Sequence, residues 1–520
     1  MSEKLSSVGG KLLSGSVLQV VILTVTAITS FFLMPFIVHH LGDRIYGFWS
    51  LAAAFIGYYS LLDLGLSGAV SQYISIAIGR NDQEECRAIF NTALRIQLML
   101  GGFALLLTAI IIVATPWFCH NTADAHLFRN VIAILGINAA LSFPQRVYGG
   151  VLYTEFRFDI LSWISFLWLA LRTGFSVCAI LAGGGLLSLA WVTFLASLPI
   201  AGLQIWFARR EALWARIEMG PVRIKTAKSL SSYSVYSFLA YLADILRFQV
   251  DPLVISSLIG LAAVTHYRVA GMFAQYYLQI LMFSVGMLQP VLSRLHGSGD
   301  RAGLEKVFFF GTKISTSLSV FICLALIGWG KPFITLWMGQ KYEDGYLPLV
   351  LLSLAVLLDV FQKPSADLLF ATFKQRSYAY MNVSEGVLNL VFSVALAWRF
   401  GIVGVAMGTL IGAFVIRAAV QPWWVCRSSG FHYADYMRFL GKNLLCCGCL
   451  MGAATAIVVW GLRPSYPFLV SSAICATAIY SIGTWVFMLN PSEREHFKKA
   501  LRRNLDQKQA EPVSVIASVS

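Results

Sequence analysis

Apolar residues are gathered along this chain in long blocks, with polar residues in short segments between them. A helix that crosses a bilayer needs about 20 mostly apolar residues, and by this measure the chain holds about fourteen candidate spans. They centre on Leu23, Leu62, Ala104, Leu135, Ala170, Leu195, Ala243, Leu278, Leu318, Leu358, Leu390, Leu410, Met451 and Ala478. The pattern predicts an all-α, polytopic membrane protein.

The second candidate span, residues 46–79, is longer than one straight helix across the bilayer requires. It is interrupted by Gly57, Gly65 and Gly68, and glycine is a weak helix former. We therefore expect this span to be tilted or kinked.

The composition supports a membrane location. Hydrophobic residues make up 58% of the chain and charged residues 12%, and the mean hydropathy is +0.72. A soluble domain has about 25% charged residues, so this chain lacks the polar side chains to cover a water-exposed surface. The formal net charge of +14 sits in short basic segments between apolar runs, which favours an orientation signal over nucleic-acid binding.

The basic residues also predict the orientation. If the N-terminus is cytoplasmic and the loops alternate, cytoplasmic segments carry about 25 Lys and Arg residues against about 5 on the other side. We therefore expect a multi-pass protein of the cytoplasmic membrane with both termini inside. The two strongest basic segments, residues 208–228 and the tail from Pro491, are either topology determinants or amphipathic segments on an anionic leaflet.

The chain shows self-similarity at a constant offset of 218 residues. The matched pairs are Gly42 with Gly260, Tyr58 with Tyr276, Tyr59 with Tyr277, Asp82 with Asp300, Phe90 with Phe308, Arg95 with Lys313 and Ile96 with Ile314. The register does not slip over more than fifty residues, and the matched positions fall in equivalent loops and spans. We infer a duplicated unit of six spans.

This duplication predicts the domain organisation. The expected parts are a six-helix bundle over 1–207, a cytoplasmic basic linker over 208–228, a second six-helix bundle over 229–426, two appended transmembrane helices over 427–490 and a cytoplasmic tail over 491–520. Two such halves in the same orientation are related by an axis along the membrane normal, and a substrate would pass between them by alternating access.

Cationic residues inside the spans are candidates for function, because a charge at the bilayer centre costs about 2.5–3.5 kcal/mol on insertion scales. The candidates for a cationic, substrate-binding lumen are Arg172, Arg247, Arg146, Lys363 and Arg417. Arg172 has no acidic neighbour in its own helix and needs a partner from elsewhere. For Arg146, Lys363 and Arg417, snorkelling to the inner surface is an equal alternative, and Lys363 has the spacing to pair with Asp367.

Acidic residues inside the spans are candidates for ion coupling. They are Asp63, Asp244, Asp359 and Glu385. A carboxylate in an apolar span can bind and release a proton or Na⁺, whereas the structural alternative is a hydrogen bond to a neighbouring helix. In the seventh span, Asp244 and Arg247 lie on one helical face with Asp251, either as a cavity wall or as a self-neutralising pair.

Glycines recur every four residues in the twelfth candidate span, at Gly404, Gly408 and Gly412. Small residues at this spacing allow close approach of two helices. We expect a packing role here rather than contact with a substrate.

The region from His39 to Glu85 carries a family resemblance. Its sequence is HHLGDRIYGFWSLAAAFIGYYSLLDLGLSGAVSQYISIAIGRNDQEE, and it resembles the polysaccharide and oligosaccharide flippases of the multidrug/oligosaccharidyl-lipid/polysaccharide exporter superfamily. The motifs that carry the resemblance are Leu41-Gly42, Tyr46-Gly47, the run Leu62 to Leu66 and the turn Gly79 to Asp82. One departure is Gln72, since many relatives have arginine before the tyrosine at this point.

The resemblance implies a function. Such flippases move lipid-linked oligosaccharides, built on undecaprenyl pyrophosphate, across the bacterial inner membrane for synthesis of O-antigen or exopolysaccharide. Cationic residues in the spans suit such a phosphate-bearing cargo, and ion gradients would employ the buried carboxylates. Implied partners are the lipid-linked oligosaccharide, membrane lipids and the polymerase and export machinery.

Two alternatives remain open at this point. A drug or small-cation exporter of the same superfamily would be expected to carry more acid than base in its spans. A membrane enzyme acting on polyprenyl-linked glycans would be expected to carry a large outer loop with catalytic histidine, arginine or carboxylate groups. The chain shows no P-loop and no metal-spaced histidine pair, so we predict no catalytic residues, no metal and no cofactor.

Overall fold

The structure is a computed structural model, and almost every residue it describes is helical. The described residues are 2–63, 66–80, 82–118, 122–217, 242–243, 245–247, 249–285, 288–459, 465–488, 490–491 and 493–495. Within these ranges there is no β-strand, and ten helical segments are long and apolar enough to cross a membrane. The predicted all-α, polytopic membrane fold is confirmed, whereas the count of fourteen spans stays a prediction.

The chain forms two compact units. Unit 1 contains residues 1–272 and 375–416, and unit 2 contains residues 273–374 and 417–520. The helices of unit 1 are α1 (Ser2–Leu41), α2 (Asp43–Tyr58), the 3₁₀-helix η1 (Tyr59–Asp63), α3 (Leu66–Gly79), α4 (Gln83–Phe118), α5 (Thr122–Thr154), α6 (Phe158–Leu181), α7 (Leu186–Glu211), α9 (Asp251–Leu258), the first half of α10 (Leu261–Val285) and α15 (Gln375–Ala413).

Unit 2 begins inside α10 and is entered again in the π-helix η3 (Phe414–Val420). Its other helices are α11 (Leu288–Gly297), α12 (Arg301–Trp337), the 3₁₀-helix η2 (Gln340–Gly345), α13 (Tyr346–Phe361), α14 (Lys363–Ala371), α16 (Gln421–Ser429), α17 (Tyr433–Val459), α18 (Tyr466–Gly483) and the π-helix η4 (Thr484–Met488).

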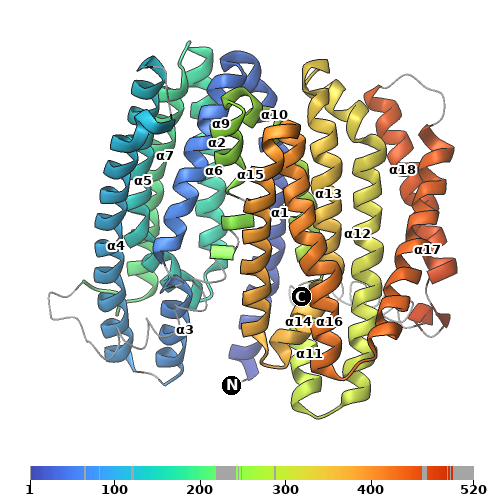
Figure 1. Cartoon of the computed structure of the whole chain (residues 1–520). Helices are drawn as coiled ribbons and strands as arrows, with labels where there is room; N and C mark the ends of the chain where they lie inside the picture. The colour runs from blue at the N-terminus through green and yellow to red at the C-terminus, as the bar shows by residue number, and fades with distance from the viewer. Residues whose placement is uncertain are drawn as a thin grey trace, which may run out of the picture. The chain divides into compact units, whose positions relative to one another are not determined.

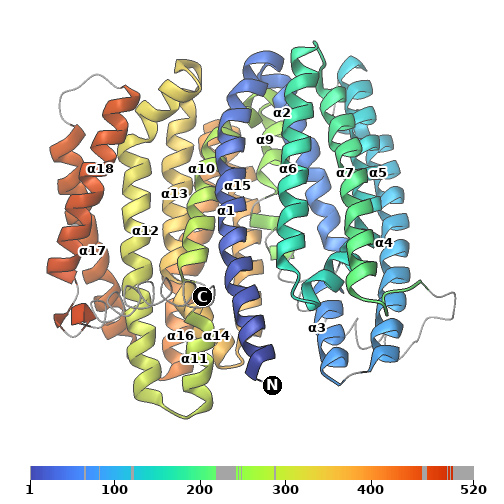
Figure 2. The same cartoon turned by 180° about the vertical axis from the view of Figure 1, so that it is seen from behind.

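Long helices pack side by side in unit 1. Helix α4 lies against α5, and α5 lies against α7 (Figure 1); seen from behind, α1 runs beside α6 (Figure 2). One buried apolar cluster contains Phe90 and Tyr148, and another contains Phe48 and Phe128. On the outer face of α4, apolar side chains such as Val113 remain 78% exposed. Because such a face is unfavourable in water, it fits contact with lipid.

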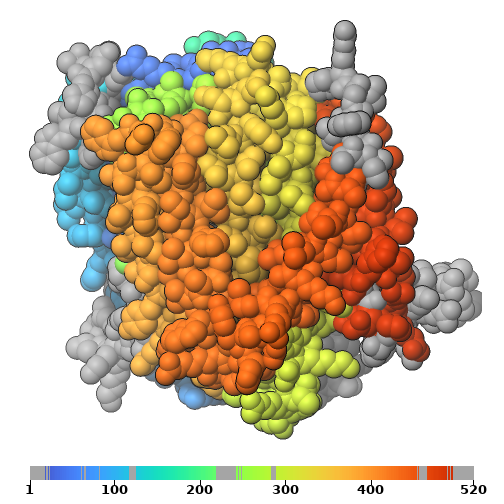
Figure 3. All heavy atoms as spheres, turned by 45° about the vertical axis from the view of Figure 1, so that its right-hand side comes forward, coloured from blue at the N-terminus to red at the C-terminus, as the bar shows by residue number. Residues whose placement is uncertain are grey.

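Helix α12 is the centre of unit 2. It packs against α13 and α17, and α17 packs against α18; Figure 3 shows α17 and α18 in red beside α12 in yellow. The buried cluster between these helices includes Val320, Cys447, Met451 and Tyr480.

The long second span is broken, as predicted. Helix α2 ends at Tyr58, the backbone tightens to a 3₁₀ turn, and α3 begins at Leu66. Of the three glycines in this stretch, Gly65 lies outside the described residues. The break leaves Asp63 at the end of the 3₁₀ turn, where its side chain can face other helices.

The helix boundaries repeat with the offset of 218 found in the sequence. Helices α2 and α10 begin at Asp43 and Leu261, and α4 and α12 begin at Gln83 and Arg301. The residue before each of the second pair is an aspartate N-cap: Asp82 accepts a hydrogen bond from the Glu85 amide and Asp300 from the Gly303 amide, both at 2.8 Å.

Later boundaries keep the same offset. Helices α3 and α11 end at Gly79 and Gly297, and α7 and α16 end at Glu211 and Ser429. The two related segments therefore fold into matching helices at matching positions. The domain boundaries that we drew from the repeat stay a prediction, and the linker beyond residue 217 and most of the tail lie outside the described residues.

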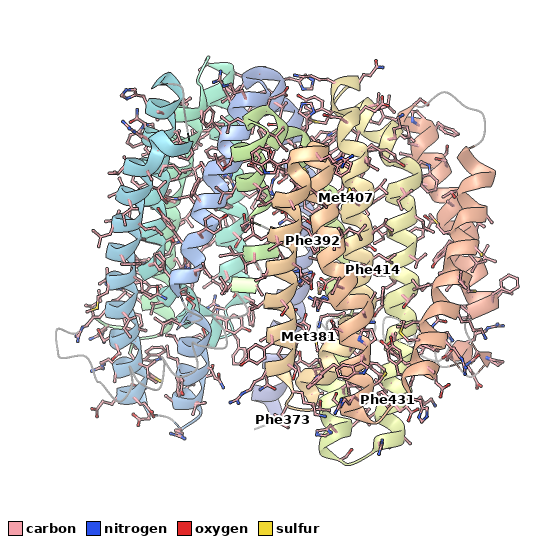
Figure 4. All side chains as sticks on the ribbon, in the orientation of Figure 1. Phe373, Met381, Phe392, Met407, Phe414 and Phe431 are labelled. Carbon is pink, nitrogen blue, oxygen red and sulfur yellow. The ribbon has the colours of Figure 1, made fainter. Side chains whose placement is uncertain are left out.

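Helix α15 is folded back on itself at Gly401, whose φ of 59° lies in the region that favours glycine. Of the residues labelled in Figure 4, Met381 and Phe392 lie on the first arm of this hairpin and Met407 on the second. The turn divides the 55-residue apolar segment into two runs that can each cross a membrane.

The glycine series on the second arm makes the hairpin possible. A Cβ atom on Gly408 would collide with the Ser393 backbone, one on Gly404 with the Leu396 carbonyl, and one on Gly412 would lie 3.0 Å from the Glu385 carbonyl oxygen. The predicted packing role of this series is therefore confirmed.

Candidate functional site

The carboxylate of Asp63 is held at the centre of a polar cluster in unit 1. Gln97 donates to its Oδ1 atom at 2.5 Å and the Ser67 hydroxyl at 2.9 Å, and Asp63 is only 3% exposed. The Arg146 guanidinium lies 3.8 Å from the same oxygen, with a third of its side chain accessible. The predicted candidates Arg146 and Asp63 thus form one site, which their separation of more than eighty residues conceals in the sequence.

Arg247 pairs with Glu385. The Arg247 Nε atom lies 3.0 Å from Glu385 Oε1, and both side chains are mostly buried. Asp244, the other candidate in this helix, lies outside the described residues. The pair joins the segment before α9 to the first arm of α15. A predicted substrate-binding cation, Arg247, and a predicted ion-coupling acid, Glu385, are therefore in contact with each other.

A second acidic site in unit 1 is centred on Asp251. This residue shares a predicted helical face with Arg247 but was not among the predicted ion-coupling residues. Tyr267 donates to Asp251 Oδ2 at 2.6 Å, and Asn389 and Thr409 lie beside the carboxylate. Asp251 is 5% exposed, and within the described part of the chain its Oδ1 atom receives no hydrogen bond by distance and angle.

Oxygen atoms converge around this aspartate. The Asn389 side-chain oxygen accepts hydrogen bonds from Ser393 at 2.8 Å and from Thr409 at 3.2 Å. Carboxylate, amide and hydroxyl oxygens are the ligands that hard cations prefer, and a carboxylate can also take up a proton. The sequence signal for this site was weak, because Asn389, Ser393 and Thr409 are common polar residues in spans.

Arg417 is fully buried in unit 2. Its Nε atom lies 3.1 Å from Asp359 Oδ1, with 1% and 8% of the two side chains accessible. Arg417 also donates to Gln421 at 2.7 Å, and Gln421 donates to the Gln362 carbonyl at 3.0 Å. The alternative that Arg417 snorkels to the inner surface is therefore wrong, because its partners hold it inside the helix packing.

Lys363 pairs with Asp367 one turn later in α14, as its spacing predicted. Asp367 is fully buried and Lys363 partly so. The lysine therefore serves first to neutralise a buried acid.

Arg172 differs from the other predicted cations. Its guanidinium carbon lies 5.0 Å from the centre of the Trp168 ring, one turn earlier in α6, which is the geometry of a cation–π contact. In the described part of the chain no carboxylate lies within ion-pair distance of it. Of the five predicted cations, it therefore carries the charge that is least neutralised.

Trp168 is also part of the wall of a cavity of about 450 Å³ in unit 1. The cavity lies between α1, α5, α6 and α7, and its polar lining consists of amides and hydroxyls, namely Thr26, Asn138, Ser142, Gln145, Ser165, Ser197 and Gln204. Gln145 donates to Gln204 at 2.7 Å, and Ser197 donates to Asn138 at 2.6 Å. Among the described residues no charged side chain lines this cavity, so its chemistry favours a neutral, hydroxyl-rich ligand.

The described residues contain no cluster of acidic, histidine or cysteine side chains that could bind a metal ion. Across the ranges that the structure describes, no group of three or more such residues is close enough to hold a metal ion. The polar chemistry of the spans lies in ion pairs, single carboxylates and the amide-lined cavity.

Comparison with known proteins places this architecture in a family. The model of the family described as polysaccharide biosynthesis protein matches residues 41–347, more than half of the chain. The chain belongs to this family. The match includes the region on which the sequence resemblance rested.

Relatives of this polysaccharide biosynthesis family member support the assignment. The chain is 22% identical over 486 residues to the uncharacterized membrane protein EpsK of Bacillus subtilis, covering 91% of this chain and 95% of the relative. It is 25% identical over 224 residues to the uncharacterized membrane protein MJ1068 of Methanocaldococcus jannaschii, covering 42% of each.

Solved structures share the fold. The inward closed form of the lipid II flippase MurJ has a TM-score of 0.68 at 14% identity, over 91% of this chain and 98% of that one. An inward-facing multidrug resistance MATE transporter of the MOP superfamily has a TM-score of 0.68 at 17% identity, over 77% and 94%. The chain is therefore a multi-pass membrane protein of a polysaccharide biosynthesis family with the fold of the MOP transporters.

Proposed function

We propose that this protein is a flippase that moves a lipid-linked oligosaccharide across the cytoplasmic membrane by alternating access. The observation that carries the proposal is the amide-lined cavity of unit 1, whose wall includes Trp168, the ring on which the Arg172 guanidinium stacks. A guanidinium suits a phosphate group, and amides, hydroxyls and an indole ring suit the hydroxyls and apolar faces of sugars. The family supports a cargo used in polysaccharide synthesis.

The lining of the same cavity favours a lipid-linked oligosaccharide over the cationic cargo of a drug exporter. A site for a cationic drug would be expected to carry an acidic side chain to balance the charge of its ligand. Among the described residues the cavity lining has none, and the span acids Asp63 and Glu385 of unit 1 each lie beside an arginine, Arg146 and Arg247 respectively.

A genetic experiment tests the function. Deletion of the gene is expected to abolish a surface polysaccharide while its lipid-linked repeat unit accumulates on the cytoplasmic side. Restoring the wild-type gene should restore the polysaccharide. Normal polysaccharide with no accumulation in the deletion strain would refute the proposal.

Variants of Arg172 test the cargo site. Arg172→Gln removes the charge and Arg172→Lys keeps it, so we expect a loss of polysaccharide export of at least about tenfold for the first and a smaller loss for the second. Arg399 is a matched control, since it stacks on Phe400 at the end of the first arm of α15. Equal export by Arg172→Gln and Arg399→Gln would remove Arg172 from the transport path.

We further propose that Asp251 is the ion-coupling carboxylate, in preference to Asp63, Asp359 and Glu385, the predicted acids that lie within the described residues. Asp359 and Glu385 each contact an arginine, and Asp63 receives hydrogen bonds from Gln97 and Ser67. Asp251 instead has neutral neighbours, so a proton or Na⁺ can neutralise it during transport.

Transport in proteoliposomes separates these carboxylates. Asp251→Asn is expected to make transport independent of the proton and Na⁺ gradients, because the permanently neutral side chain no longer binds an ion. Asp63→Asn is the comparison, and it should keep the gradient dependence. Unchanged gradient dependence in Asp251→Asn would reject this assignment while leaving the flippase proposal intact.

A further inference from the structure

A cationic cavity of about 350 Å³ lies at one end of unit 2. Three segments form it: the turn between α11 and α12, the turn between α14 and α15, and the end of α16. Its charged side chains are His296, Asp300, Arg301 and Lys374, beside an apolar lining that includes Leu295 and Leu368. By the distribution of Lys and Arg residues, this end of the unit is predicted to face the cytoplasm.

The charge of this cavity is positive. The Asp300 carboxylate already accepts the Gly303 amide as the N-cap of α12, and the start of that helix adds positive potential. Lys374 donates to the Ser428 carbonyl, and Arg301 donates to the Ser429 carbonyl at 3.3 Å. Those contacts satisfy the last carbonyls of α16, and each cation retains further N–H donors.

The internal repeat supplies a comparison for this cavity. Near the turn between α5 and α6 the best offset is 217, which matches Phe156 with Phe373, both at positive φ, and Arg157 with Lys374. In unit 1 Arg157 is neutralised by two carboxylates, Asp159 at 3.0 Å and Glu211 at 2.5 Å.

Unit 2 has lost these acids. At the offset of 217, Asp159 corresponds to Arg376 and the neighbouring Glu155 to Thr372; at the offset of 218, which the ends of α7 and α16 keep, Glu211 corresponds to Ser429. Lys374 therefore has no carboxylate partner among the described residues. The duplicated turn keeps the cation and the positive φ of the preceding phenylalanine. Arg376 and Ser429 stand where unit 1 has the two acids that pair with Arg157, and Lys374 lines a cavity instead of forming a salt bridge.

We propose that this cavity binds a phosphate group at the cytoplasmic end of unit 2. The side chains of Lys374 and Arg301 supply positive charge, and the first turn of α12 adds positive electrostatic potential. His296 also lines the cavity. The phosphate belongs either to an anionic phospholipid of the adjacent leaflet or to a soluble phosphate ester. The exposed ring of Phe373, 81% accessible and 6.5 Å from the His296 ring, favours the lipid, because aromatic side chains settle at the membrane interface.

The test uses the full chain in phosphatidylcholine nanodiscs. Native mass spectrometry measures how much added phosphatidylglycerol is retained, and calorimetry measures binding of inorganic phosphate and glycerol phosphate. Retained phosphatidylglycerol without binding of the soluble anions would identify a lipid site, and binding of the soluble anions without retained lipid would identify a soluble ligand. Either result supports the cavity as a phosphate site provided that the variants below abolish it.

The informative variants restore the acids of unit 1. Ser429→Glu copies Glu211, and Thr372→Glu copies Glu155. Both residues line the cavity, so each variant adds a carboxylate to its wall. We expect at least about a tenfold weaker affinity for the anion in either variant. Arg438→Gln is the control, because it changes the net charge equally at an 82% exposed side chain of α17. Binding that is equal in the wild type, both glutamate variants and Arg438→Gln would overturn the proposal, as would no binding of any of the three anions.

Discussion

The buried ion pair of Arg417 and Asp359 is expected to contribute strongly to the stability of unit 2, and its removal tests this directly. With 1% and 8% of the side chains accessible, neither group can reach water if its partner is removed. Asp359→Asn removes the charge that balances the buried guanidinium, while the hydrogen bond from Arg417 to Gln421 remains. Removal of one partner of a buried ion pair costs about 3–5 kcal/mol.

The expected effect can be placed on a temperature scale. For domains of 150–250 residues, 1 kcal/mol shifts Tm by about 2–4 °C, so Asp359→Asn should lower the melting temperature of the purified protein by about 6–20 °C. The double variant Asp359→Leu with Arg417→Met replaces the pair by apolar groups of similar size. Because such replacements are often neutral, most of the lost stability should return.

The exposed pair of Asp435 and Arg438 is the control, at 69% and 82% accessible. Asp435→Asn should change stability by less than about 1 kcal/mol. Melting is followed by intrinsic fluorescence in detergent, and export is measured in cells. A melting temperature for Asp359→Asn that matches Asp435→Asn would refute the buried pairing, and a stable double variant without export would show that the pair acts in transport rather than in stability.

Three further outcomes follow from the structure. Gly408→Ala should reduce the yield of folded protein because its methyl group meets the Ser393 backbone, whereas Gly174→Ala, which has open space around it, should be tolerated or slightly stabilising; equal yields would contradict the close hairpin. Burial raises the pKa of Glu155 above its usual 4.5, so the folded state holds the carboxyl proton more tightly than the unfolded state and loses stability as the pH rises above 4.5. Glu155→Gln should therefore be more stable than the wild type at pH 7 but not at pH 4. A difference in melting temperature that does not depend on pH would contradict the raised pKa. Gln97→Leu removes the 2.5 Å hydrogen bond to buried Asp63 and should destabilise unit 1 by about 1–3 kcal/mol, measured by chemical denaturation; a variant as stable as the wild type would show that water replaces the amide.

Local features of this protein were predictable from its sequence. The length of an apolar run decides whether a helix can cross the bilayer, and the break after Tyr58 followed from glycines inside one long run. The spacing of Lys363 and Asp367 within one helix predicted their ion pair. The glycine series predicted close packing, because only a missing side chain lets two backbones approach.

The partners of the intramembrane charges were decided by tertiary structure. Arg247 and Glu385 are far apart in the sequence, yet the Glu385 carboxylate lies 3.0 Å from the Arg247 guanidinium. Arg417 and Asp359, and likewise Arg146 and Asp63, come from helices far apart in sequence. Which helices meet depends on packing between surfaces that are apolar everywhere, so hydropathy does not distinguish a face toward lipid from a face toward another helix.

The sequence alone therefore determined that this chain is a duplicated, helical membrane protein with charges inside its spans, since these properties follow from local composition and from a constant offset. Only the tertiary structure decided which charges neutralise one another, placed Trp168 in the wall of an amide-lined cavity, and brought Asp251 together with Tyr267. The physical reason is that an ion pair or a cavity is a property of two or more helices at a fixed distance, and no single stretch of the chain encodes that distance.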